Sequence, residues 1–166
     1  MNVSINKSSL FYLLWYTFTH MESRTYRHYA NILWLLLVLF VCRVFAQLAV
    51  YFIEVPYIPS FNQWHSASMP YGLLIFSQAV IILIFTRITL SFTWARVVPR
   101  YRVGLSLLTI GGLYFSLMLS RLIIGVLSLS DIPWWNKPIP SFFHLVLATF
   151  LIVVGYFHWH YGKKQE

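Results

Sequence analysis

Acidic residues are nearly absent from this sequence. Its 166 residues include 4 Asp and Glu against 12 Lys and Arg, and charged residues make up only 10 % of the chain. Ordinary soluble domains carry about 25 % charged residues. Hydrophobic residues reach 59 %, and the mean hydropathy is +0.69. This composition excludes a soluble globule and predicts an integral membrane protein, which at this length forms one domain.

Cysteine is almost absent as well, since Cys42 is the only one. A single cysteine forms no intramolecular disulfide, no CxxC redox pair and no multi-cysteine zinc site, which excludes a disulfide-exchanging membrane oxidoreductase. The sequence also contains neither GxSxG nor HExxH, the motifs of common serine hydrolases and zinc proteases. We therefore expect no metal site, and whether the protein is an enzyme stays open.

The most prominent feature of the sequence is its long apolar runs. A membrane-spanning helix needs about 20 mostly apolar residues, and the sequence offers four such runs, at about 32–53, 71–90, 103–129 and 141–161. They predict an all-α, four-helix transmembrane bundle over residues 29–166. Residues 8–19 are too short to span but rich in aromatic side chains, which predicts an interfacial helix within the N-terminal segment 1–28. Residues 22–29 would be a short connector.

The basic residues lie mainly on one side of these spans. Lys137 falls on the opposite side, and Arg43 and Arg121 fall within spans; the others are Lys7, Arg24, Arg27, Arg87, Arg96, Arg100, Arg102, Lys163 and Lys164. This is the positive-inside pattern, and it predicts that both termini are cytoplasmic. The positive charge of +8 is then explained by topology and anionic lipid headgroups rather than by nucleic acid. A multi-pass protein of a bacterial inner membrane fits this pattern.

Arg43 lies at the midpoint of the first span. Gln47 and Glu54 follow it at i+4 and i+11, so the three share one helical face. Inserting an arginine near the bilayer centre costs roughly 2.5 kcal/mol on insertion scales, and it normally faces a protein interior, a wet cavity or a partner. The polar residues whose insertion into the membrane is costly therefore mark a candidate site.

Each of the other spans adds a polar side chain at or outward of its middle: Gln78, Arg121 and His144. We expect these three to form one layer with Arg43 and Gln47. This layer predicts a polar pocket open to the outer side, beneath a loop that carries Glu54, Trp64 and His65. Because arginine suits carboxylate and phosphate groups, the expected ligand is a small anionic or polar amphiphile, either a lipid headgroup or a quinone-like molecule. A role as an accessory subunit is compatible with this.

Four alternatives stay open. The polar residues could form a purely structural network or face a protein partner. A small enzyme that modifies a lipid or isoprenoid could use His65 or His144 as a base, with the arginines stabilising an anionic transition state. A haem-binding electron carrier would use His144 and His158, which are 14 residues apart on one span. The first three spans hold no histidine in their middle, however, so haem is not expected.

Small residues follow one face of the third span. Thr109, Gly112, Ser116 and Ser120 recur at helical spacing, and such a stripe lets two helices approach closely. We expect this stripe to pack inside the bundle. Alternatively, it is the contact face for a second copy of the chain or for another membrane protein.

Overall fold

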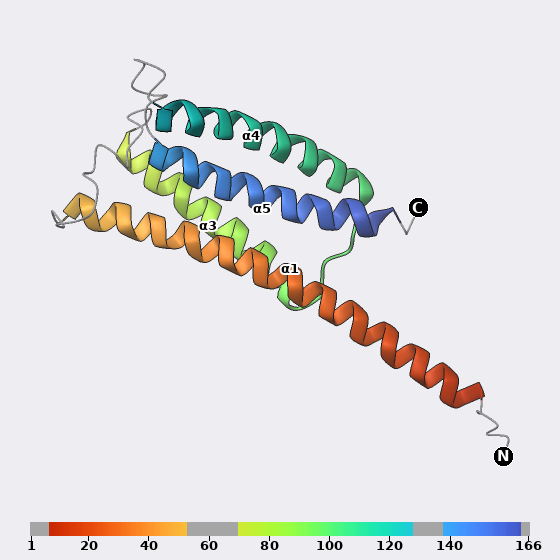
Figure 1. The fold of residues 1–166 in the computed structure, drawn as a ribbon. Coiled ribbons are helices and arrows are strands. Elements are labelled where there is room, and N and C mark those ends of the chain that lie inside the picture. Colours follow the sequence, from red (N-terminus) through yellow and green to blue (C-terminus); the bar gives the residue numbers. More distant parts are fainter. Residues whose placement is uncertain (1–6, 53–69, 128–137, 164–166) are drawn as a thin grey trace.

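The computed structural model describes residues 7–52, 70–127 and 138–163, with side chains from residue 24 onward. This part of the chain is all helical (Figure 1), with α1 at Lys7–Phe52, α3 at Tyr71–Thr93, α4 at Tyr101–Leu127 and α5 at Pro138–Gly162. All four helices are long and apolar enough to cross a membrane. A helix of 23 residues, the length of α3, extends about 35 Å, slightly more than a hydrocarbon core of about 30 Å. The prediction of a multi-pass, all-α membrane protein is confirmed to this extent.

Helix α1 is longer than expected. Its 46 residues extend about 69 Å at helical rise, and its N-terminal part projects beyond the other three helices (Figure 1). Residues 22–29, which we expected to form a connector, are helical. The reason lies in the sequence, because the first proline is Pro56 and the first glycine is Gly72, so nothing breaks the helix before residue 52. The expected helix at 8–19 is therefore the first part of α1.

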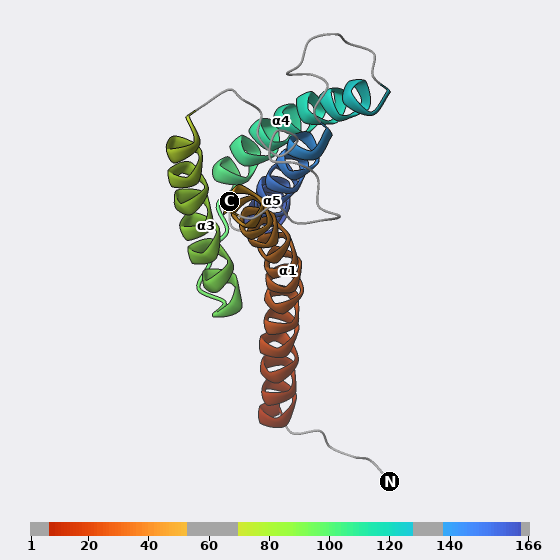
Figure 2. The ribbon, with the colours of Figure 1, turned by 90° about the vertical axis from the view of Figure 1, so that its left-hand side faces the viewer.

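The helices form two pairs. Helix α4 packs along α5, α1 packs along α3, and α1 also contacts α5. No Cα atom of α3 comes within 8 Å of a Cα atom of α4 in the described ranges, and the two helices stand apart in Figure 2. We call the end that carries the α3–α4 connection the loop end, and the end at which α1 stops and α3 starts the far end. The bundle is thus closed on three sides by helix contacts.

Glycines bring α4 and α5 close together. Gly104 and Gly111 of α4 are seven residues apart, as are Gly155 and Gly162 of α5. A Cβ atom at Gly104 would overlap the Trp159 backbone, and one at Gly155 would lie 2.9 Å from the Leu108 nitrogen. Neither position accommodates a side chain at this helix separation. Close backbone approach through small residues is a common mode of helix packing in membranes.

The stripe of small residues on α4 does not form this interface. Thr109, Ser116 and Ser120 are exposed, and a Cβ atom at Gly112 would meet no other atom within 4 Å. The expectation that the stripe packs inside the bundle was wrong. The three hydroxyl groups donate hydrogen bonds to carbonyl groups of their own helix, so they are satisfied even when they face lipid. A different face of α4 packs on α5, and its glycines, Gly104 and Gly111, are spaced by seven residues.

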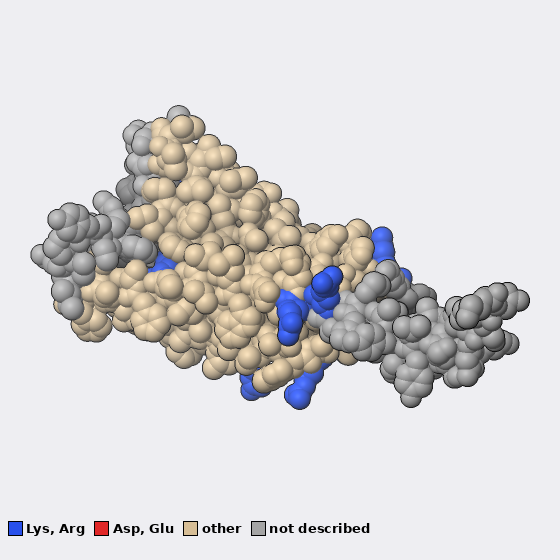
Figure 3. Space-filling model, turned by 60° about the horizontal axis from the view of Figure 1, so that its bottom comes forward, with Lys and Arg blue, Asp and Glu red and all other residues tan. Residues whose placement is uncertain are grey.

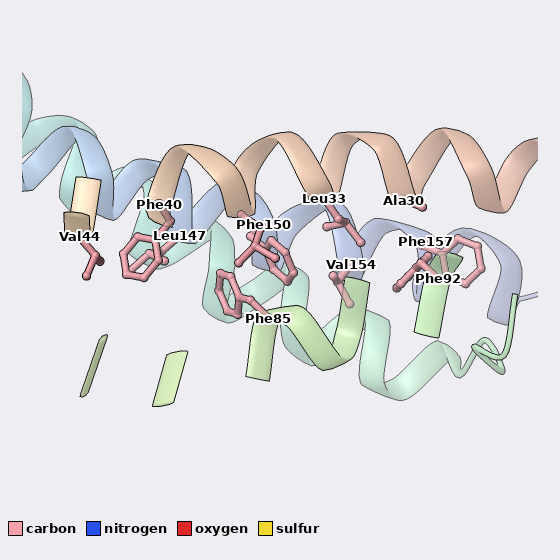
Figure 4. Packing of buried hydrophobic residues seen from close by; sticks show 11 residues of the cluster. Ala30, Leu33, Phe40, Val44, Phe85, Phe92, Leu147, Phe150, Val154 and Phe157 are labelled. Carbon is pink, nitrogen blue, oxygen red and sulfur yellow. The ribbon is translucent and has the colours of Figure 1, made fainter. Parts of the chain in front are cut away.

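A cluster of buried apolar side chains fills the space between α1, α3 and α5 (Figure 4). Phe85 of α3 and Phe150 of α5 stack with ring centres 3.7 Å apart. Nearer the loop end, Phe92 and Phe157 meet edge to face at 4.8 Å. These aromatic contacts join α3 to α5, although the two backbones do not come close.

The connection between α3 and α4 is held at three points. The Tyr26 hydroxyl of α1 donates to the Val97 carbonyl at 3.0 Å, and the Arg100 amide donates to His158 Nδ1 at 3.1 Å. Helix α3 ends in a Schellman motif, in which Ala95 adopts a positive φ of 51° and the Arg96 amide bonds the Ser91 carbonyl. The loop end is therefore tied to α1 and α5.

Lysine and arginine side chains of the described residues gather toward the loop end (Figure 3). Arg24 and Arg27 lie on the part of α1 that reaches this end, and the others are Arg87 on α3, Arg96 and Arg100 in the connection, Arg102 at the start of α4 and Lys163 after α5. Arg43 and Arg121 are the exceptions among them, since both are buried.

Candidate functional site

Two polar side chains of α1 are buried one turn apart. Arg43 is 7 % exposed and Gln47 is 1 % exposed. They continue the face that buries Leu33, Leu37 and Phe40, because residues three, four and seven apart align on one side of a helix. The helix thus turns these polar groups into the bundle together with its apolar face.

Of the two polar atoms of the Gln47 amide, only the oxygen has a hydrogen-bond partner. Gln78 of α3, itself 4 % exposed, donates from its Nε2 atom to Gln47 Oε1 at 3.0 Å. The Gln47 Nε2 atom is buried and has no hydrogen-bond partner in the structure, and the same holds for Arg43 Nε. Both atoms are N–H donors. A buried donor without an acceptor costs about 1–3 kcal/mol.

Helices α4 and α5 supply the opposite wall. The Tyr114 hydroxyl lies 2.6 Å from His144 Nδ1, and Arg121 beside them on α4 is 2 % exposed. The charges of Arg43 and Arg121 both act on Tyr114 and on His144, which places the four side chains near one another. The Arg43 guanidinium carbon also lies 5.2 Å from the centre of the Phe143 ring, a cation–π contact.

We call these side chains the polar layer: Arg43, Gln47, Gln78, Tyr114, Arg121 and His144. The four acids of the chain, Glu22, Glu54, Asp131 and Glu166, all lie outside the residues whose side chains are described. Among the described side chains the layer therefore holds two guanidinium groups and no carboxylate. Its unpartnered buried atoms are donors, so what the layer can bind is an acceptor, and an anionic one best balances the charge.

The structure brings together five of the residues that the sequence predicted: Arg43, Gln47, Gln78, Arg121 and His144. Glu54, Trp64 and His65 lie outside the described residues. Sequence reasoning missed Tyr114 and Phe143. Tyr114 stands seven residues before Arg121, which is two helical turns on the same face, so spacing alone could have indicated it. Phe143 gave no such signal, because it is one of many apolar residues in its span.

Two of the three histidines of α5, His144 and His158, are engaged through Nδ1. A backbone amide can only donate, so His158 Nδ1 accepts the hydrogen bond from Arg100, and the neutral ring then carries its proton on Nε2. In that tautomer neither nitrogen has a free lone pair for iron. No three His, Cys, Asp or Glu side chains gather as a metal site in the described ranges.

Comparisons of the chain with protein-family models, with curated proteins and with solved structures find no match. Its function is therefore inferred from the chemistry of the polar layer.

Proposed function

We propose that this membrane protein binds a small anionic or polar amphiphile at the polar layer, either as an independent binding protein or as an accessory subunit. The observation that carries the proposal is the pair of buried donors on α1, Arg43 Nε and Gln47 Nε2, that have no acceptor in the structure. A lipid headgroup or a quinone-like molecule supplies acceptor oxygens. An acidic headgroup in addition neutralises Arg43.

Energetics favour an anion over a neutral ligand. A guanidinium group taken out of water loses several kcal/mol of solvation unless a counter-charge or several acceptors replace the water. Carboxylate and phosphate oxygens match the planar donor geometry of arginine and form its shortest hydrogen bonds. Gln47 Nε2, one turn further along the same face, adds a neutral donor for a second oxygen.

The orientation in the membrane belongs to the proposal. With the basic loop end on the cytoplasmic side, both termini are cytoplasmic and the polar layer lies toward the outer side. The N-terminal part of α1, which projects beyond the bundle and includes residues 8–19, then lies on the cytoplasmic side. A bacterial inner membrane fits this arrangement. In a Cys42→Ser background, a membrane-impermeant thiol reagent added to intact cells should label Ser60→Cys and not Arg96→Cys. The reverse pattern would invert the topology.

A second candidate is a membrane enzyme acting on a lipid or isoprenoid at the same layer. The observation in its favour is the hydrogen bond between Tyr114 and His144 beside two arginines. Such a pair can exchange a proton with a bound substrate, while the guanidinium groups stabilise negative charge. Turnover lost in His144→Ala with ligand binding retained would favour the enzyme over the binding protein.

The exposed stripe of Thr109, Gly112, Ser116 and Ser120 is the surface that we assign to a partner, either a second copy or another membrane protein. Cross-linking in native membranes through Gly112→Cys, in a Cys42→Ser background, tests this. A monomer under all conditions would leave the stripe facing lipid.

The test of the binding proposal is native mass spectrometry of the protein extracted gently with its lipids. We expect a defined adduct on the parent and on Arg87→Gln, which removes an exposed arginine, and its loss from Arg43→Gln and Arg121→Gln. An adduct that persists in Arg43→Gln, or a parent without any adduct, would leave a purely structural network as the better explanation.

A further inference from the structure

We infer that the ligand is a long-chain amphiphile with one acidic head, and that it reaches Arg43 sideways from the bilayer, between α3 and α4. This inference rests on the proposed function. It adds the chemical class of the ligand and the route by which the ligand enters.

The first argument is the arrangement of the helices around the polar layer. Arg43, Gln47 and Gln78 come from the α1–α3 pair, whereas Tyr114 and His144 come from the α4–α5 pair. The helices that supply the layer are in contact in three pairs, α1 with α3, α1 with α5, and α4 with α5. In the fourth neighbouring pair, no Cα atom of α3 lies within 8 Å of a Cα atom of α4 in the described ranges, and Figure 2 draws the two helices apart.

The second argument is depth. At 1.5 Å per residue, Arg43 lies about 14 Å before Phe52, the last residue of α1, and Gln78 lies about 11 Å past Tyr71, the first residue of α3. Both residues are therefore well below the far end of the bundle, at the level of the hydrocarbon. A water-soluble anion would have to leave water to reach them. A membrane amphiphile already has its tail at this depth.

The third argument is the surface that the route offers to a tail. Ile81 and Ile88 of α3 and Leu107 of α4 are partly buried apolar side chains beside the core cluster. Tyr114, half-buried, follows Leu107 by two turns on the α4 face that also carries Arg121. An apolar chain lying between the two helices contacts such side chains, while its head meets Arg43.

The head is acidic. Arg43 is the guanidinium group whose buried Nε lacks an acceptor, and one acidic group balances it. A head without charge would satisfy the hydrogen bonds of Gln47 and leave Arg43 uncompensated. A cationic head would be repelled by both arginines.

The experiment compares four probes that differ in the acidic group, carboxylate or phosphate, and in whether they carry an alkyl tail. The probes are dodecanoate, acetate, dodecyl phosphate and inorganic phosphate. Binding to the full chain in a nonionic detergent is measured by scintillation proximity with radiolabelled dodecanoate and dodecyl phosphate, the tailless anions serving as competitors. We expect saturable binding of at least one tailed probe, weakened roughly 10- to 100-fold in Arg43→Gln, the loss expected for a charge-assisted hydrogen bond. Arg87→Gln, with an exposed arginine on α3, is the matched control and should bind as the parent does. Circular dichroism verifies that both variants are folded.

A probe with a diazirine at the end of its tail then reports the route. Cross-links should fall on residues 71–93 and 101–127 and disappear in Arg43→Gln. Competition by acetate or phosphate as strong as that by the tailed probes, or cross-links that avoid both helices, would overturn the lateral route and leave the binding proposal standing. Binding of both radiolabelled probes that does not depend on Arg43 would overturn the binding proposal itself.

Discussion

Replacing Gly104 by alanine should weaken the bundle more than the same change at Gly111 or Gly112 of the same helix. The new Cβ atom would overlap the Trp159 amide nitrogen and lie 2.6 Å from its Cα and 2.7 Å from the His158 carbonyl carbon. All three are backbone atoms of α5, so no side-chain rotation relieves the overlap. The helices must therefore separate locally, and the contacts beside Gly104 are lost.

The magnitude follows from two opposing terms. Overpacking a well-filled interface costs about 1–3 kcal/mol, and rigid backbone atoms place this case toward the upper end. Alanine in place of a helical glycine returns about 0.5–1 kcal/mol through backbone entropy. We therefore expect Gly104→Ala to lower the free energy of unfolding by about 1–2 kcal/mol.

Gly112→Ala is the matched control on the same helix. Its Cβ atom would meet nothing within 4 Å, so only the entropy term remains, and the variant should be more stable by about 0.5–1 kcal/mol. Unfolding in mixed micelles with increasing dodecyl sulfate, followed by far-ultraviolet circular dichroism, measures both. Equal stabilities for the two variants would refute the α4–α5 packing described above.

Three further predictions concern single contacts. Ala95→Gly should raise stability by about 0.5–1 kcal/mol, because alanine is strained at a positive φ and glycine is not; a loss in the same unfolding assay would contradict the Schellman motif. Gln78→Leu should cost about 1–3 kcal/mol by leaving the Gln47 carbonyl without its donor, and Gln47→Leu added to it should restore most of that loss; additive losses would mean that the two amides do not pair. Tyr114→Phe should cost about 0.5–1.5 kcal/mol and shift the ¹⁵N resonance of His144 Nδ1, its partner in the structure; an unchanged resonance would argue against the bond.

The sequence predicted most of the polar layer because a polar side chain within a long apolar run is costly in lipid, and this cost can be judged one helix at a time. Arg43 and Gln47 had to share a face at i and i+4, whatever their neighbours. The heights of Gln78, Arg121 and His144 along their own spans were likewise countable from the ends of the apolar runs. Residue spacing could not predict which side chains of different helices pair. The hydrogen bond from Gln78 to Gln47 depends on the packing of α3 beside α1 in the structure.

Helix contacts were predicted less well. The stripe at Thr109, Gly112 and Ser116 has the small residues of a packing face, yet it is exposed, while Gly104 and Gly111 meet α5. Both faces of α4 are rich in small residues, and no local rule says which one meets a neighbour. Which face of α4 is buried depends on where α5 packs, and that contact joins residues far apart in the chain.

The sequence by itself determined that four long apolar helices form, since composition and run length decide membrane insertion one segment at a time. It also determined that two arginines would be buried among them. Only the tertiary structure decided that the helices form two pairs, that α3 and α4 stand apart, and that two donors on α1 are left without an acceptor. Those are relations between segments, and they arise when side chains compete for one shared interior.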